Sequence, residues 1–274
     1  MSQAETTNFT VCALFYGDYP ALASRCLGSI ARSLEGESNV ELRLGLNSVS
    51  NATRSYIQTT ASMLVKNGTS VLIYDAGDVN RLKYPMMRKM FYDAVNPVRT
   101  SHLMWFDDDS YITQPDDFWR LVEAGVQDTA VLGQLYTIRI RGHQAAGISR
   151  QPWYTGKTVD TQRHIFKFPT GGFWIAKTSV ITADDYPFTA ITHCGGDVML
   201  GELCRQRNYR MRAFGRGVAV NADDAGRESK AARRGVSVPP VWSELRDSHT
   251  ALSYHDFTLT GQQPDNRDHA AGRV

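Results

Sequence analysis

The sequence contains no apolar run approaching the roughly 20 residues that a membrane-spanning helix requires. Its first ten residues, MSQAETTNFT, have neither the basic nor the apolar region of a secretory signal. It also lacks the patterns G-x-x-x-x-G-K-[ST], H-E-x-x-H and G-x-S-x-G, so nothing points to a P-loop NTPase, a zinc protease or a serine hydrolase. We therefore expect a cytoplasmic protein with no membrane partner, and no obligate protein partner is evident.

Cysteine and net charge are both low. The four cysteines form no C-x-x-C pair, which argues against structural zinc and favours free, buried thiols. The net charge is only +2, but it is unevenly distributed. Residues 138–167 carry six basic and one acidic side chain, and residues 205–234 carry nine basic and three acidic ones. This asymmetry suggests a partner that bears phosphate, although a solvated basic surface would give the same pattern.

Strand-like and helix-like segments alternate through the first half of the chain. Apolar runs predict strands at 9–16, 40–46, 70–74 and 102–106, and helical spacing predicts helices at 20–34, 52–66 and 84–95. Such alternation predicts an α/β fold, with a mostly parallel, nucleotide-binding type of sheet and helices on both faces. The second half is less regular, with a strand near 172–177, a helix near 197–208 and a loop at 222–240. No linker divides the chain, so we expect one domain over residues 1–274.

Three consecutive carboxylates, Asp107 to Asp109, follow the apolar strand at 102–106. Like charges this close repel one another unless a cation or proton lies among them. Ligands of open α/β sheets bind beyond the carboxyl ends of the strands, and carboxylates suit Mn²⁺ or Mg²⁺. We predict a divalent metal site here. The alternative is a solvated acidic turn before a helix at Gln114-Pro115.

Three further segments carry candidate functional residues. Gly171 and Gly172 precede the aromatic pair Phe173 and Trp174, and would allow a ligand to approach the backbone while the rings line a sugar site. The alternative is an ordinary turn into a buried strand. Asp197 follows two glycines at a predicted helix start, where it could act as a general base or only as an N-cap. Late in the chain, His255 or His249 could complete a metal site through a neutral imidazole or be structural.

Together these segments resemble nucleotide-sugar glycosyltransferases of the GT-A fold. The opening run TVCALFYGDYPALASRCLGSI is similar to the start of family 2 enzymes. The order WFDDDSY, FPTGGFWIA, GGDVMLGEL and SYHDF resembles the fringe-like, inverting branch. The resemblance implies a smaller acceptor-side β region and divides the chain into a nucleotide-sugar half (9–111), an acceptor-side half (112–257) and a tail (258–274).

The resemblance also implies roles for individual residues. Mn²⁺ or Mg²⁺ would be held by Asp107, Asp109 and His255, and Asp197 would be the catalytic base. Asn47 stands where family 2 enzymes often have an aspartate, and Gly196 replaces the first acid of the usual acidic pair. The donor, a UDP-sugar, would contact Phe15, Tyr16, Asn47, Lys83, Arg88, Asp107, Asp108, Gly171, Gly172 and Trp174.

The acceptor is not specified by these motifs. The basic segments favour DNA, and the chain looks compatible with phage enzymes that glycosylate hydroxymethylated bases in the host cytoplasm. Such a base would have to be flipped out of the stack, where Tyr136, Trp153 and Tyr154 could stack on it. The alternatives are a transferase for protein or saccharide hydroxyls, a metal-dependent nuclease or phosphohydrolase, and a non-catalytic sugar-binding module.

Overall fold

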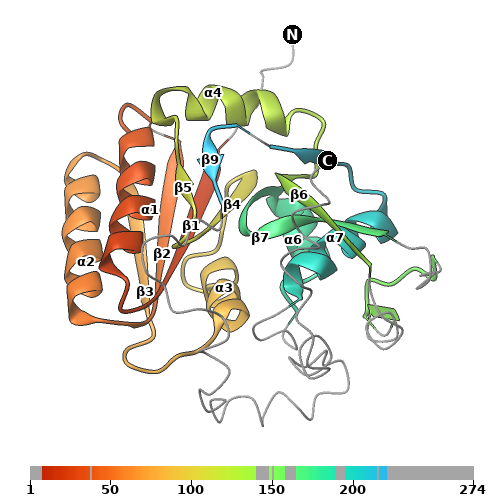
Figure 1. Cartoon of the computed structure of the whole chain (residues 1–274), viewed down its shortest axis with the longest axis horizontal. Helices are drawn as coiled ribbons and strands as arrows, with labels where there is room; N and C mark the ends of the chain where they lie inside the picture. The colour runs from red at the N-terminus through yellow and green to blue at the C-terminus, as the bar shows by residue number, and fades with distance from the viewer. Residues whose placement is uncertain are drawn as a thin grey trace.

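A seven-stranded sheet forms the centre of the protein, with strand order β3-β2-β1-β4-β7-β6-β8 (Figure 1). The computed structural model describes residues 8–37, 39–139, 148–149, 151–157, 165–188, 195–214 and 216–220. Within these ranges, no helix has both the length and the apolar character to cross a membrane. The strands are β1 (Phe9–Gly17), β2 (Val40–Val49), β3 (Ser70–Asp75), β4 (His102–Asp107), β6 (Val131–Arg139), β7 (Ile165–Lys177) and β8 (Met211–Ala213).

Strand β7 is the one reversed strand of this sheet as described. Strands β3, β2, β1 and β4 are parallel, β7 is antiparallel to both β4 and β6, and β8 pairs in parallel with β6. A separate two-stranded antiparallel sheet joins β5 (Tyr111–Ile112) to β9 (Val218–Ala219). The predicted α/β class with a mostly parallel sheet is confirmed.

Helices cover both faces of the sheet and enclose two hydrophobic cores. On one face lie α1 (Pro20–Ser33), α2 (Asn51–Lys66) and α4 (Pro115–Val126), and Figure 1 shows α1 and α2 side by side. On the other lie α3 (Lys83–Phe91), α6 (Thr178–Ala183) and α7 (Gly196–Arg207). In α1 the predicted apolar positions Leu22, Cys26, Leu27 and Ile30 are all buried, as their helical spacing requires.

Several element bounds differ from the sequence predictions. Strand β2 does not end at Asn47-Ser48 but continues to Val49, with Ser48 at a φ of 57°. Helix α3 ends at Phe91 rather than near residue 95. Strand β7 begins at Ile165, so the glycine pair lies within the strand and not in a turn before it. Helix α4 begins at Pro115, where a helix was expected only under the alternative of a solvated acidic turn, and strand β6 was not predicted. The expected loop at 222–240 and the tail lie outside the described residues.

A buried arginine on β2 fixes the end of α3. The Arg43 side chain is fully buried, and its guanidinium donates to the carbonyl oxygens of Met90 and Asn96 and to the carboxylate of Glu41, the latter at 2.6 Å. Met90 lies in the last turn of α3, where carbonyl groups have no partner within the helix and a cation is favourable. Arg43 therefore holds α3, which carries Lys83 at its other end, against the sheet.

Candidate functional site

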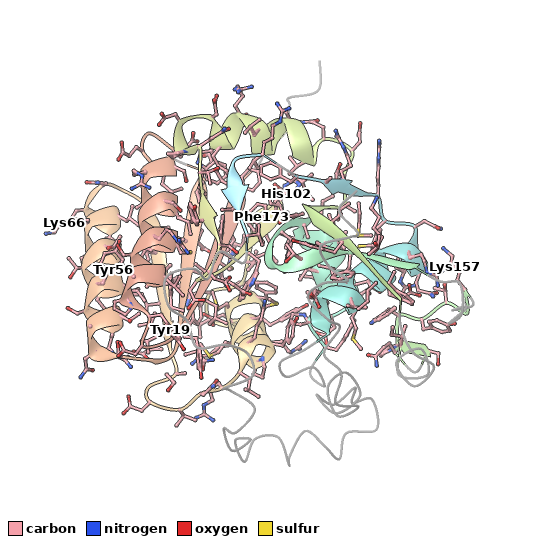
Figure 2. All side chains as sticks on the ribbon, viewed as in Figure 1. Tyr19, Tyr56, Lys66, His102, Lys157 and Phe173 are labelled. Atoms are coloured by element: carbon pink, nitrogen blue, oxygen red, sulfur yellow. The ribbon has the colours of Figure 1, made fainter. Side chains whose placement is uncertain are left out.

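The carboxyl ends of β1, β2 and β4 meet at one edge of the sheet. Tyr16 on β1 pairs with Asn47 on β2, and Leu14 pairs with Asp107 on β4. Figure 2 shows the direction in which these parallel strands run. His102, where β4 begins, lies toward the top, and Tyr19, just after β1, lies toward the bottom. This is the edge at which open α/β sheets bind ligands.

Asp107 is the last residue of β4, and both of its carboxylate oxygens accept hydrogen bonds. The indole Nε1 of Trp105 donates to Oδ1 at 2.9 Å, and the ammonium Nζ of Lys83 donates to Oδ2 at 2.7 Å. The Asp107 side chain keeps about a fifth of its surface exposed, with a relative exposure of 21%. Its carboxylate is thus held in a fixed orientation at the sheet edge while remaining accessible.

Lys83 connects three elements at this edge. It is the first residue of α3, and besides contacting Asp107 on β4 it donates to the carbonyl oxygen of Gly171 on β7 at 2.6 Å. Its Nζ also lies 5.7 Å from the centre of the Trp105 ring, within range of a cation–π attraction. The ammonium is therefore surrounded by negative or electron-rich groups.

Asp108 and Asp109 differ in their surroundings. The Asp108 carboxylate is buried and accepts a hydrogen bond from the backbone N–H of Tyr16 at 3.3 Å, whereas Asp109 is partly exposed. Burial raises the pKa of the nearby Cys26 thiol, and the three aspartates raise it further. Negative charge is thus concentrated just beyond β4. Within the described ranges, however, no three His, Cys, Asp or Glu side chains form a group that could hold a metal ion.

The glycine pair brings β7 close to both Lys83 and Asp197. A Cβ atom at position 171 would lie 3.2 Å from Lys83 Nζ and 3.5 Å from Asp197 Oδ2. Glycine at position 171 therefore leaves room for both the Lys83 ammonium and the Asp197 carboxylate. This observation joins the start of α3, the end of β4 and the start of α7 into one site.

The aromatic pair after the glycines does not face this site. Phe173 and Trp174 are fully buried. The Trp174 ring stacks on that of Trp105 with 6.5 Å between ring centroids, and the Phe173 ring packs against that of Phe106 with 4.9 Å between centroids. The prediction that they line a sugar site is wrong. Successive side chains of a strand point to opposite faces, and both faces of this strand are covered by a hydrophobic core.

Asp197 lies in the first turn of α7, and it is Gly195, at a φ of 83°, that caps the helix. The backbone N–H of Val198 donates to Asp197 Oδ1 at 2.9 Å, while Oδ2 lies toward Gly171. A helix N-terminus stabilises a carboxylate. The Asp197 carboxylate also contributes, after burial, to the raised pKa of Tyr186, whose hydroxyl donates to the Gly196 carbonyl at 3.1 Å.

Two glycines of α7 set the position of Asp197. A Cβ atom at Gly196 would lie 2.3 Å from Cζ of Tyr84, so the ring on α3 occupies the space that a side chain would need. A Cβ atom at Gly201 would lie 2.3 Å from the Lys167 carbonyl oxygen on β7. The tyrosine explains why no acidic residue stands at position 196. Tyr84 and Tyr186 were not predicted as site neighbours, and only the glycine at 196 signalled a close approach.

The remaining donor-site candidates have structural contacts. Asn47 is buried, donates to Asn80 Oδ1 at 3.0 Å and accepts from the Arg81 N–H at 2.7 Å, which orders the segment before α3. Arg88 donates to the carbonyl oxygens of Asp185 and Pro187 and to the Asp185 carboxylate.

Phe15 is fully buried and Tyr16 is partly exposed. Of the two basic candidates, Lys83 is the one that contacts Asp107. Both His249 and His255 lie outside the described residues.

The basic segments are only partly described. Arg205 and Arg207 form ion pairs with Glu202 and Asp184 at 2.6 and 2.7 Å. Arg212 lies on β8, which pairs with the beginning of β6 and so lies toward the opposite end of the sheet from Asp107. Of the residues expected to stack on a base, Trp153 is buried and packs on the Phe188 ring at 5.5 Å, so its part of that prediction is wrong.

Comparison with known proteins gives a likeness in structure only. No protein-family model matches the chain, and no curated protein sequence matches it. A mannosyltransferase, PcManGT from Pyrobaculum calidifontis in complex with GDP-Man and Mn²⁺, is similar with a TM-score of 0.52 and 13% identity, over 77% of this chain and 55% of that chain. S. aureus TarS 1–349 in complex with UDP-GlcNAc has a TM-score of 0.49 and 14% identity, over 87% of this chain and 64% of that chain.

The similarity to the mannosyltransferase confirms the predicted GT-A fold class. At this level of identity it extends to the fold alone. The chain spans just over half the length of that mannosyltransferase.

Proposed function

We propose that this chain is a glycosyltransferase that moves a sugar from a nucleoside-diphosphate sugar to an acceptor hydroxyl. The observation that carries the proposal is the meeting of Asp107, Lys83, Gly171 and Asp197 at the carboxyl edge of the sheet. A donor diphosphate needs a cationic contact as it leaves, and an acceptor hydroxyl needs a base as it attacks. Lys83 supplies the first and Asp197 the second. The mannosyltransferase that shares this fold binds GDP-Man and Mn²⁺.

In the proposed reaction Asp197 accepts the proton of the acceptor hydroxyl and Lys83 contacts the leaving group. The acceptor hydroxyl gives its proton to Asp197 Oδ2 as its oxygen forms a bond to the anomeric carbon. The bond from that carbon to the diphosphate breaks, and its electron pair leaves with the diphosphate. Lys83 stabilises the departing anion from the side of β4. We place the base on the face of the sugar opposite the leaving group, an arrangement in which transfer inverts the anomeric centre.

We propose Mn²⁺ or Mg²⁺ as the metal cofactor and a UDP-sugar as the donor. The oxygen donors of Asp107 and Asp109 suit a hard cation, and Asp107 Oδ2 already holds a cationic group, the Lys83 ammonium. The ion would be held by Asp107 and Asp109, with His255 as a further ligand, and would neutralise charge on the diphosphate. Tyr16 and Asp108, which contact each other beside Asp107, would border the donor.

A donor panel tests the class of reaction. Thermal unfolding is measured with a set of nucleoside-diphosphate sugars, with and without Mn²⁺, and one donor should raise the midpoint. If none does under either condition, and phosphodiester or phosphate-ester substrates are cleaved instead, the chain is a hydrolase and the proposal fails.

Replacing the proposed base separates catalysis from binding. We expect Asp197→Asn to lower donor turnover, measured as nucleotide release, by on the order of 10²–10⁴-fold, since a positioned base contributes about that much. Donor affinity, measured by calorimetry, should be unchanged. Wild-type turnover in this variant would remove Asp197 from the role.

As acceptor we propose a hydroxymethylated base in DNA, on the strength of the basic segments at 138–167 and 205–234. Binding to duplex DNA should weaken as salt is added, because phosphate contacts release counterions. Absence of binding at low salt would direct the search to protein or saccharide hydroxyls.

A further inference from the structure

The ammonium of Lys83 lies where a metal ion would compete for the same oxygen. It is 2.7 Å from Asp107 Oδ2 and 2.6 Å from the Gly171 carbonyl oxygen, and the side chain is only 14% exposed. An ammonium has three N–H donors, so these two contacts leave one for a ligand. A carboxylate oxygen and a carbonyl oxygen are also typical ligands of hard divalent ions.

We propose that the Lys83 ammonium is the cation that occupies the donor site until a divalent ion displaces it from Asp107. The displaced ammonium then contacts the donor diphosphate. This inference rests on the proposed function, because it assigns Lys83 to the same site. It differs from a purely structural role for the Lys83–Asp107 ion pair. A structural pair would stay closed whether or not ligand is present.

Electrostatics gives the exchange its direction. Two cations cannot share one carboxylate oxygen at short range without strong repulsion. While the site holds no anion, Lys83 therefore opposes metal binding at Asp107. A diphosphate brings negative charge that both cations can contact, so nucleotide and metal should strengthen each other's binding by the same factor.

The surroundings of Lys83 allow its side chain to move without its helix. The far end of α3 is fixed by the buried Arg43, and Arg88 anchors the helix to the turn at Asp185 and Pro187. The lysine side chain is a flexible four-carbon chain with a compact charge. The ammonium can therefore leave Asp107 while the backbone of α3 stays in place.

The test compares Lys83→Met with a matched control, Lys89→Met, which removes the same charge from an exposed position on the same helix. Mn²⁺ affinity is measured without nucleotide by electron paramagnetic resonance of the free ion. UDP affinity is measured by calorimetry in the presence of a chelator. For Lys83→Met we expect Mn²⁺ to bind about tenfold more tightly and UDP about tenfold more weakly, as loss of a nearby unit charge predicts. Lys89→Met should change neither by more than about twofold, because solvent and salt screen an exposed charge.

The opposite signs of the two changes separate the proposal from simple damage, since a misfolded variant would bind both ligands more weakly. A second variant, Lys83→Arg, keeps the charge and should retain the weak Mn²⁺ binding of the wild type. Unchanged or weaker Mn²⁺ binding in Lys83→Met overturns the proposal, as does a wild-type protein that binds no Mn²⁺ even with UDP. In either case, stabilisation by a nucleotide sugar would leave the proposed glycosyl transfer standing. Absence of any nucleotide-sugar binding would instead count against the transferase.

Discussion

Adding one methyl group at Gly201 should loosen the contact that positions Asp197. The new Cβ would lie 2.3 Å from the Lys167 carbonyl oxygen and 2.5 Å from Cβ of Phe168, whereas ordinary contact begins at 3.4 Å. Strand β7 is hydrogen-bonded to β4 on one side and β6 on the other, so it cannot shift easily. Helix α7 must therefore move away from β7 by about 1 Å. Overpacking of this kind costs about 1–3 kcal/mol, offset by the roughly 0.5–1 kcal/mol that alanine gains over glycine in a helix.

The control is Gly28→Ala in α1, where the added Cβ would meet nothing closer than the Tyr56 hydroxyl at 3.3 Å. Urea unfolding should show Gly28→Ala gaining about 0.5–1 kcal/mol and Gly201→Ala losing about 1–2 kcal/mol. For a chain of this size, that loss corresponds to a melting temperature lower by roughly 2–8 °C.

The same shift would carry Asp197 with α7. Nucleotide release from the donor should fall by on the order of 10²-fold, because a displacement of about 1 Å at a catalytic group has that effect. A Gly201→Ala protein as stable and as active as Gly28→Ala would refute the argument that close packing of α7 on β7 sets the site.

Two further predictions concern buried charge. Arg43→Met should lower the free energy of unfolding by about 3–5 kcal/mol, because it removes the donor that Glu41 and two backbone carbonyls share inside the protein; an unchanged urea midpoint would contradict this. Burial, and then the charge of Lys177, lower the pKa of His102 to about 4, below the 6.5 of an exposed histidine. Between these two pKa values the folded state therefore binds fewer protons than the unfolded state. The contribution of His102 to the free energy of unfolding is complete above pH 6.5, and up to about 3 kcal/mol of it should be lost as the pH drops toward 4. His102→Gln should flatten that fall when urea midpoints at pH 7 and 4.5 are compared, and an equally steep fall in the variant would exclude His102 as its source.

The first half of the fold could be predicted because its signals are local. The helical spacing in α1 and the apolar runs of β1 and β4 each lie within one segment of sequence. Helix α4 was expected only under the alternative of an acidic turn before Gln114-Pro115, although Pro115 and the acidic residues of its first turn are typical of a helix start.

The candidate site was predicted in part. Asp107 and Asp197 stand at a strand end and a helix start, positions that sequence alone can indicate. The contact of Lys83 with Gly171 joins residues 88 positions apart, and it requires both the pairing of β7 with β4 and the contact of Lys83 on α3 with Asp107. The burial of Trp174 was not predictable for a similar reason, since it depends on residues of α3 and α7 packing against its face of β7.

The hydrogen bond from the Trp105 indole to Asp107 gives the protein an optical reporter of its own. Trp105 is fully buried, so quenching by bulk solvent contributes little to its emission. A change in the charge or contacts of the Asp107 carboxylate alters the field along that indole N–H and shifts the emission. Because the chain has five tryptophans, the part of the emission change that is lost in Trp105→Phe would report occupancy at the sheet edge.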